Sequence, residues 1–179
     1  LFRIKSVAFY LCDFQVFQNG QAFSVSDTIT LNTFLGSDTS GQLFTNDFQL
    51  VRRSPVIYAV GTFQQDGNFE AVDFQFGLTE AAQKVIPSKA PINHPLFTQS
   101  DSLWRGPSDG FVFLQAVVVR DSMASTQPDT LRFLQADLGL LRLSASGLFV
   151  HPTGYDFPLV LTVDYKKMFE GVNWSIHDI

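Results

Sequence analysis

The sequence has little cysteine and no concentrated positive charge. A single cysteine, Cys12, among 179 residues excludes an internal disulfide and argues against a cysteine-based zinc site. The chain holds 12 basic and 17 acidic residues, and basic side chains adjoin only at Arg52-Arg53 and Lys166-Lys167. Nucleic-acid binding and membrane-surface helices both normally need a concentrated basic face, so neither is expected here.

Motifs of the common enzyme classes are missing as well. The chain has no Gly-x-Ser-x-Gly nucleophile motif and no glycine-rich loop of the kind that binds phosphate. Its three histidines, His94, His151 and His177, are too far apart in sequence to form a helix pair or a loop chelate. Glu70 and Asp73 are close, but their odd separation places them on opposite faces of a strand. We therefore expect no metal, no cofactor and no enzymatic activity.

Signals for membrane insertion and export are not visible either. No hydrophobic run reaches the length of a membrane span, and no segment has the pattern of a signal peptide. The chain begins at Leu1 rather than at Met, so we expect either a removed leader or a longer precursor. Asn173-Trp174-Ser175 has the form of an N-glycosylation site, which matters only in a secreted protein.

What the sequence does have is a long alternation of apolar and polar residues at its start. Apart from Ser6, the even positions from Phe2 to Val16 are apolar, and the odd positions are apolar between residues 7 and 11. Successive side chains on a strand point to opposite faces. The alternation therefore predicts one long strand over residues 1–17, covered on both sides at its centre and burying Cys12. Asn19-Gly20 follows, which is the strongest short signal for a hairpin turn.

Shorter alternating segments fill most of the remaining chain. The patterns predict strands over residues 22–31, 42–51, 56–64, 68–77, 110–120, 148–151 and 159–165, and two strands within 131–143 that are separated near Gly139. They predict turns at residues 65–67 and 144–147, a polar loop at residues 36–41 and one short helix at residues 79–85. The 19 phenylalanines suit a thick core. These signals predict an all-β fold: a single-domain antiparallel β-sandwich over residues 1–179, jelly-roll-like or a flattened barrel, with one short helix.

Residues 86–110 form a long proline-rich segment that contains the best candidate for a ligand site. Asp101 and Asp109 bracket Trp104 and Arg105 there. An aromatic platform beside hydrogen-bond acceptors suits a sugar or a calcium-bridged ligand. The alternative is a solvated loop in which Trp104 folds back over the edge of the core.

The two ends of the chain carry more apolar surface than a self-contained domain needs. The tail at residues 166–179 stays apolar after the last clear strand, and the first strand exceeds the usual strand length of about 5–6 residues. One hypothesis is that the first strand pairs with the sheet edge of a neighbouring subunit. The alternative is an ordinary long strand that bends around a corner and serves both sheets. The expected assembly contacts are Phe2, Ile4, Val7, Phe9, Leu11, Phe169, Trp174 and Ile176.

Three classes of function agree with these patterns. The first is a non-enzymatic structural subunit of a self-assembling homo-oligomer, such as a virion capsid or tail component or an extracellular filament. The second is a binding module for carbohydrate or a small ligand that uses the Trp104 loop. The third is a β-sandwich hydrolase whose site residues converge from distant loops. The apolar ends and the missing catalytic motifs favour the first class, which places the chain in a virion or outside the cell.

Overall fold

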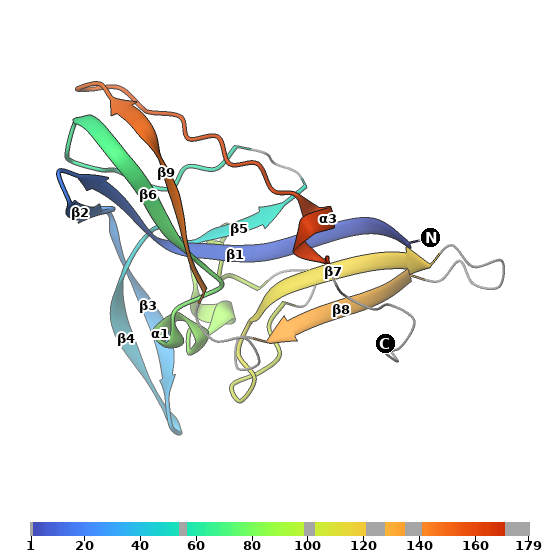
Figure 1. The fold of residues 1–179 in the computed structure, drawn as a ribbon. Helices are drawn as coiled ribbons and strands as arrows, with labels where there is room; N and C mark the ends of the chain where they lie inside the picture. Colours follow the sequence, from blue (N-terminus) through green and yellow to red (C-terminus); the bar gives the residue numbers. More distant parts are fainter. Residues whose placement is uncertain (1, 54–56, 99–102, 121–127, 135–140, 171–179) are drawn as a thin grey trace.

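The computed structural model describes residues 2–53, 57–98, 103–120, 128–134 and 141–170. These residues form a seven-stranded and a two-stranded antiparallel sheet with two short α-helices, which confirms the predicted all-β fold (Figure 1). The strands are β1 (Phe2–Gln18), β2 (Gln21–Ser24), β3 (Thr28–Leu35), β4 (Asp38–Thr45), β5 (Gln49–Arg52), β6 (Gly67–Phe76), β7 (Val112–Arg120), β8 (Pro128–Leu134) and β9 (Leu141–His151). The helices are α1 (Glu80–Gln83) and α3 (Tyr165–Met168), with a 3-10 turn at Pro87–Lys89.

The first strand, β1, organises the larger sheet, whose order is β8-β7-β1-β6-β9. Ala8 pairs at the same time with Gln115 of β7 and with Arg52 of β5, so these two strands lie on opposite edges of β1. Further along β1, β6 continues the edge of β7, and β2 continues the edge of β5. The predicted long strand is therefore confirmed, and its own chain uses both of its edges. Asn19 and Gly20 both have positive φ, as the predicted turn requires.

A β-bulge at Asp13 exchanges the two faces of β1. The φ of Asp13 is 54°, and the register between β1 and β6 shifts across it. Before the bulge, the even-numbered Tyr10 and Cys12 belong to one hydrophobic cluster, and after it the even-numbered Phe14 and Val16 belong to another. One extra residue in a strand reverses its alternation. The bulge therefore lets a single strand contribute large apolar side chains to both clusters.

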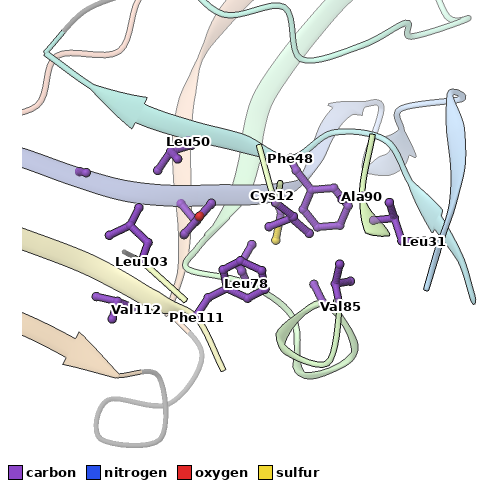
Figure 2. Packing of buried hydrophobic residues seen from close by; sticks show 14 residues of the cluster. Cys12, Leu31, Phe48, Leu50, Leu78, Val85, Ala90, Leu103, Phe111 and Val112 are labelled. Atoms are coloured by element: carbon purple, nitrogen blue, oxygen red, sulfur yellow. The ribbon is translucent and has the colours of Figure 1, made fainter. Parts of the chain in front are cut away.

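The two clusters lie on the two sides of β1. The α1 core, drawn in Figure 2, comprises Ala8, Tyr10, Cys12, Leu31, Phe48, Leu50, Leu78, Ala82, Val85, Ala90, Leu96, Leu103, Phe111 and Val112. The β6 core comprises Val7, Phe9, Leu11, Phe14, Val16, Val25, Phe69, Val72, Phe74, Phe113, Leu114, Ala116 and Phe169. Phenylalanines are buried in both clusters, as their number predicts. Cys12 is buried too, and burial raises the pKa of its thiol to about 12.

The short helix α1 begins where the sequence predicts. Thr79 is its N-cap, and the Thr79 side-chain oxygen accepts a hydrogen bond from the Ala82 amide at 3.3 Å. Glu80 lies in the first turn, where the positive end of the helix dipole favours an anion. Ala82 and Val85 face the α1 core, so the helix closes that core from below the sheet in the view of Figure 1.

Several predicted boundaries are wrong because pairing with a distant strand overrides local composition. Residues 38–41, expected in a polar loop, already belong to β4, and the turn is confined to Gly36-Ser37. Residues 144–147, expected in a turn, lie inside β9, because residues 144–146 pair with β6 and the strand continues past the register shift that follows them. The expected strand at 42–51 divides into β4 and β5. Two strands do form around the expected break near Gly139, which itself lies outside the described residues.

Two other expected strands are extended but have no strand partner within the described part of the chain. These segments are residues 57–66 and 157–164, drawn as coil in Figure 1, and their partly buried apolar side chains pack against the β6 core. Phe63 and Phe157 pack against that core and against each other, with ring centroids 6.3 Å apart. Phe63 and Leu159 are partly buried, as the alternation predicts, but Leu161 and Val163 are exposed, and the expected strand partners are not found among the described residues. As a result the predicted hairpin at residues 65–67 does not form, and Tyr165 starts α3 instead of ending a strand.

Candidate functional site

The side chains expected to make assembly contacts in β1 pack inside their own chain. Val7, Phe9 and Leu11 are buried members of the β6 core, and Ile4 packs against that core. Phe169 is buried in the same core, with its ring centroid 6.4 Å from that of Phe133. Val7, Phe9, Leu11 and Phe169 are therefore covered within their own chain, whereas Ile4 remains partly exposed. The Phe2 side chain, Trp174 and Ile176 lie outside the described residues.

The expected ligand loop holds its tryptophan against the core. Trp104 is partly buried, and its ring centroid lies 4.9 Å from that of Phe111 and 6.1 Å from that of Phe34. Both ring contacts occupy aromatic surface that a sugar would need. Arg105 and Asp109 are exposed beside it, and Asp101 lies outside the described residues. The arrangement matches the alternative in which Trp104 folds back over the edge of the core.

A groove that the sequence does not reveal lies between the β3–β4 hairpin and α1. It has a volume of about 510 Å³, and its lining includes Thr33, Phe34, Ser40, Gln42, Thr79 and Lys84. The groove forms because β3 also pairs along the edge that faces away from β4. There the Phe34 amide donates to the Lys84 carbonyl at 2.9 Å, and the Ile86 amide donates to the Asn32 carbonyl at 2.8 Å. These hydrogen bonds hold the hairpin against α1 and leave hydroxyl and amide groups on the walls of the groove.

A group of charged side chains surrounds the bulge in β1. Asp47 is buried, and its Oδ2 accepts a hydrogen bond from the Phe14 amide at 2.7 Å. Burial raises the pKa of the Asp47 carboxyl to about 6, although hydrogen bonds from backbone amides oppose the rise. Beside it, Arg142 of β9 contacts Asp13 at 2.5 Å and Asp73 at 3.5 Å. These groups fix the bulge and attach β9 to β1, which is a structural role.

His94 is the second buried group with a shifted pKa. Its Nδ1 accepts a hydrogen bond from the Leu96 amide at 3.1 Å, and its ring packs edge-on against Phe48. Burial lowers the pKa of His94 to about 4, so the imidazole is neutral near pH 7. Within the described residues its Nε2 has no hydrogen-bond partner, and no group of three or more histidine, cysteine or acidic side chains is placed to hold a metal ion.

Exposed apolar side chains concentrate near the C-terminal end of the described chain. Twelve large apolar side chains of the described residues are exposed, and eight of them fall between residues 141 and 163. We call these eight the β9 surface: Leu141, Leu143, Leu148, Val150, Tyr155, Val160, Leu161 and Val163. Those in β9 lie on both faces of the sheet, because Leu141 and Leu143 share the face of the β6 core whereas Leu148 and Val150 flank Phe149, which packs on that core. Leu148 is 76% exposed and Val160 is 85% exposed, so their side chains are almost fully in contact with solvent. Exposed apolar residues are normal when scattered singly, so this concentration in one part of the chain is the feature that needs an explanation.

The strand that carries half of this surface is also an edge of the sheet. Among the described residues, β9 pairs with β6 and with no other strand. Its one basic side chain near the start, Arg142, is occupied by the ion pairs at the bulge. At its other end, the ring nitrogens of His151 lie 2.6 Å from the Gln65 carbonyl and 3.0 Å from the Tyr155 carbonyl. Arg142 and His151 thus contact their own chain, while Ser144 and Ser146 are exposed together with the apolar side chains of β9.

Comparisons with protein-family models, with curated proteins and with solved structures find no match. Among the described residues, no helix is both long enough and apolar enough to cross a membrane.

Proposed function

We propose that this chain is a non-enzymatic structural subunit that assembles with copies of itself into a particle or filament, through the β9 surface. The observation that carries this proposal is the concentration of exposed apolar side chains between residues 141 and 163. Covering apolar surface contributes about 25 cal/mol for each Å² removed from water, so such a surface favours association. A virion capsid or tail component and an extracellular filament are the two settings in which we place it.

The buried ionisable groups support a structural role. Asp47 accepts hydrogen bonds that hold a bulge, His94 accepts one that holds a loop, and Cys12 is buried in the α1 core. None of these three lines the groove beside α1. Burial is the largest cause of all three pKa shifts, which agrees with groups held in a packed interior.

The test is the size of the protein in solution as its concentration rises. Size-exclusion chromatography with light scattering should show species several times heavier than the 20.0 kDa chain. Replacing Leu148 and Val160 together by serine should shift the assembly toward monomer, because both side chains lie in the β9 surface. Ile92→Ser is the matched control, since Ile92 is 77% exposed and lies outside that surface. A native chain that stays monomeric at every concentration would contradict the proposal.

The groove beside α1 supports a second candidate, a carbohydrate-binding module. Its walls combine the Phe34 ring with the hydroxyls of Thr33, Ser40 and Thr79 and the amide of Gln42, a mixture that suits a sugar ring. This site differs from the Trp104 loop, whose tryptophan packs against the core. Glycan-array binding by a native chain that remains monomeric would favour this candidate over self-assembly.

A further inference from the structure

A more specific contact follows from the proposed self-assembly and rests on it. The geometry points to antiparallel pairing between β9 and β9 of a second copy, related by a two-fold axis, so that two seven-stranded sheets join into one. The partner is thus a second copy of this chain, and the contact is made by backbone hydrogen bonds as well as by apolar side chains.

The first step is that β9 offers a long edge. It contains 11 residues and is the last strand in the order of the sheet. A two-fold axis through Leu143 would pair residues 141–145 of the two copies, a ladder about 17 Å long at about 3.4 Å per residue. In an antiparallel sheet, alternate residues direct their N–H and C=O groups away from the neighbouring strand, so half of the groups of β9 point away from β6.

The second step is that, within the part of the chain that the structure describes, a bulge between Ser146 and Phe149 is the only one of the usual edge protections that β9 has beyond Arg142. Natural edge strands are blocked by charges, by proline, by short length or by a covering segment. In this chain β8 begins at Pro128 and exposes Arg132, while β2 and β5 contain only four residues each. From Leu143 to Val150, β9 has neither charge nor proline. The outer edge of β4 is also free of charge and proline after Asp38, so what distinguishes β9 is its pair of exposed leucines, Leu141 and Leu143, on the face of the β6 core.

The third step is that β9 is complementary to itself. A two-fold axis through Leu143 would place Leu143 opposite its own copy and Leu141 opposite Ala145, all on one face. On the other face Arg142 would lie opposite Ser144, so that no like charges meet. This register uses the part of β9 before its irregularity, because the pairing with β6 shifts between Ser146 and Phe149. A chain of net charge −5 repels its copies over much of its surface, and an uncharged edge avoids that repulsion.

The fourth step is continuity of the core across the contact. Leu141 and Leu143 pair across the sheet with Phe76 and Phe74, so they share the face of the β6 core. They are nevertheless 51% and 37% exposed, because the sheet ends beside them. Pairing with a second β9 would bring the corresponding leucines alongside and extend the β6 core from one copy into the other. Cross-strand apolar pairs of this kind are the basic unit of sheet stabilisation.

Cysteine cross-linking tests the register directly. Directly opposed residues in an antiparallel pair have Cα atoms about 4.5–5.5 Å apart, which suits a disulfide. Leu143→Cys should therefore form a disulfide-linked dimer under mild oxidation, visible on a non-reducing gel. Leu43→Cys is the matched control, since Leu43 is 67% exposed on β4, a strand of the smaller sheet. The native Cys12 is buried and gives no background.

A charge substitution tests the same contact without a cross-link. Ser144→Lys should raise the dissociation constant at least tenfold, because it places a lysine opposite Arg142 of the second copy. Within its own chain position 144 pairs with Asp73, so the folded sheet tolerates the added charge. Gln42→Lys on β4 is the matched control for adding one positive charge to an exposed strand position. Circular dichroism and light scattering report folding and association separately.

The outcomes separate the β9 contact from the wider proposal. Native assembly, cross-linking through Leu143→Cys alone and weaker association of Ser144→Lys together support pairing through β9. Native assembly with no response to either variant, or equal cross-linking of the Leu43→Cys control, overturns that pairing and leaves self-assembly standing. A native chain that is monomeric at all concentrations overturns both.

Discussion

Asp47 and His94 are two buried ionisable groups whose effects on stability should oppose each other between about pH 4 and pH 7. The Asp47 carboxyl loses its proton near pH 3.8 in the unfolded chain and near pH 6 in the folded chain. Its stabilising effect is therefore complete below about pH 3.8 and is lost as the pH rises through about 6. The difference between the two pKa values corresponds to about 3 kcal/mol of unfolding free energy.

His94 acts in the opposite direction. Its imidazole gains a proton near pH 6.5 in the unfolded chain but only near pH 4 in the folded chain. Acidification from pH 6.5 to about 4 thus favours unfolding, again by about 3 kcal/mol. In the native chain the two contributions nearly cancel over this range, so together they leave stability almost flat.

Single substitutions should reveal how each group changes the unfolding free energy with pH. Asp47→Asn keeps an oxygen that can accept the Phe14 amide, and it removes the ionisation that opposes His94. Its unfolding free energy relative to the native chain should therefore fall by about 3 kcal/mol between pH 7 and pH 4. His94→Gln keeps an acceptor near the Leu96 amide, and its relative unfolding free energy should rise by a similar amount over the same range.

Urea unfolding at low protein concentration, followed by tryptophan fluorescence at several pH values, measures the unfolding free energy of each variant as a function of pH. Trp104 packs partly buried against the α1 core, so its emission should change on unfolding. The expected result is two variants that diverge from the native chain in opposite directions as the pH falls. Two curves that stay parallel to the native one from pH 7 to pH 4 would refute the reasoning.

Two further predictions concern packing. Trp104→Ala should lower the unfolding free energy by about 2 kcal/mol, since it removes a ring that contacts Phe34 and Phe111, and chemical denaturation measures the loss. An unchanged midpoint would show that the ring is not packed. Gly61→Ala should also cost about 2 kcal/mol, because φ is 129° and the new Cβ would lie 2.5 Å from Val25 Cγ1. A thermal midpoint equal to that of the native chain would contradict the placement of residues 57–66.

The elements that the sequence predicts well are those whose signals are local. The alternation in β1, Asn19-Gly20 after it, and Thr79 before α1 each act within a few residues of the feature they specify. The same holds for the apolar run in β7, which contributes side chains to both cores. For these elements the chain needs no information from distant residues.

The features that the sequence does not predict depend on distant partners. Ser144 and Ser146 resemble turn residues, yet they lie in β9 because they pair with Asp73 and Ala71 of β6. The burial of Asp47 is not predicted by the residues beside it in sequence, because its carboxylate accepts a hydrogen bond from the Phe14 amide at the distant bulge in β1. The β9 surface was missed for the same reason: whether Leu148 or Val160 is exposed depends on what else covers the sheet, which no local pattern records.

The bulge at Asp13 also has a consequence for how cooperatively this chain unfolds. Because β1 contributes side chains to both the α1 core and the β6 core, neither core is complete without this strand. Removal of the amino-terminal segment would open both interiors at once, so the chain cannot be divided into separately folding fragments at that point. Denaturation should accordingly proceed as one all-or-none event for the two halves.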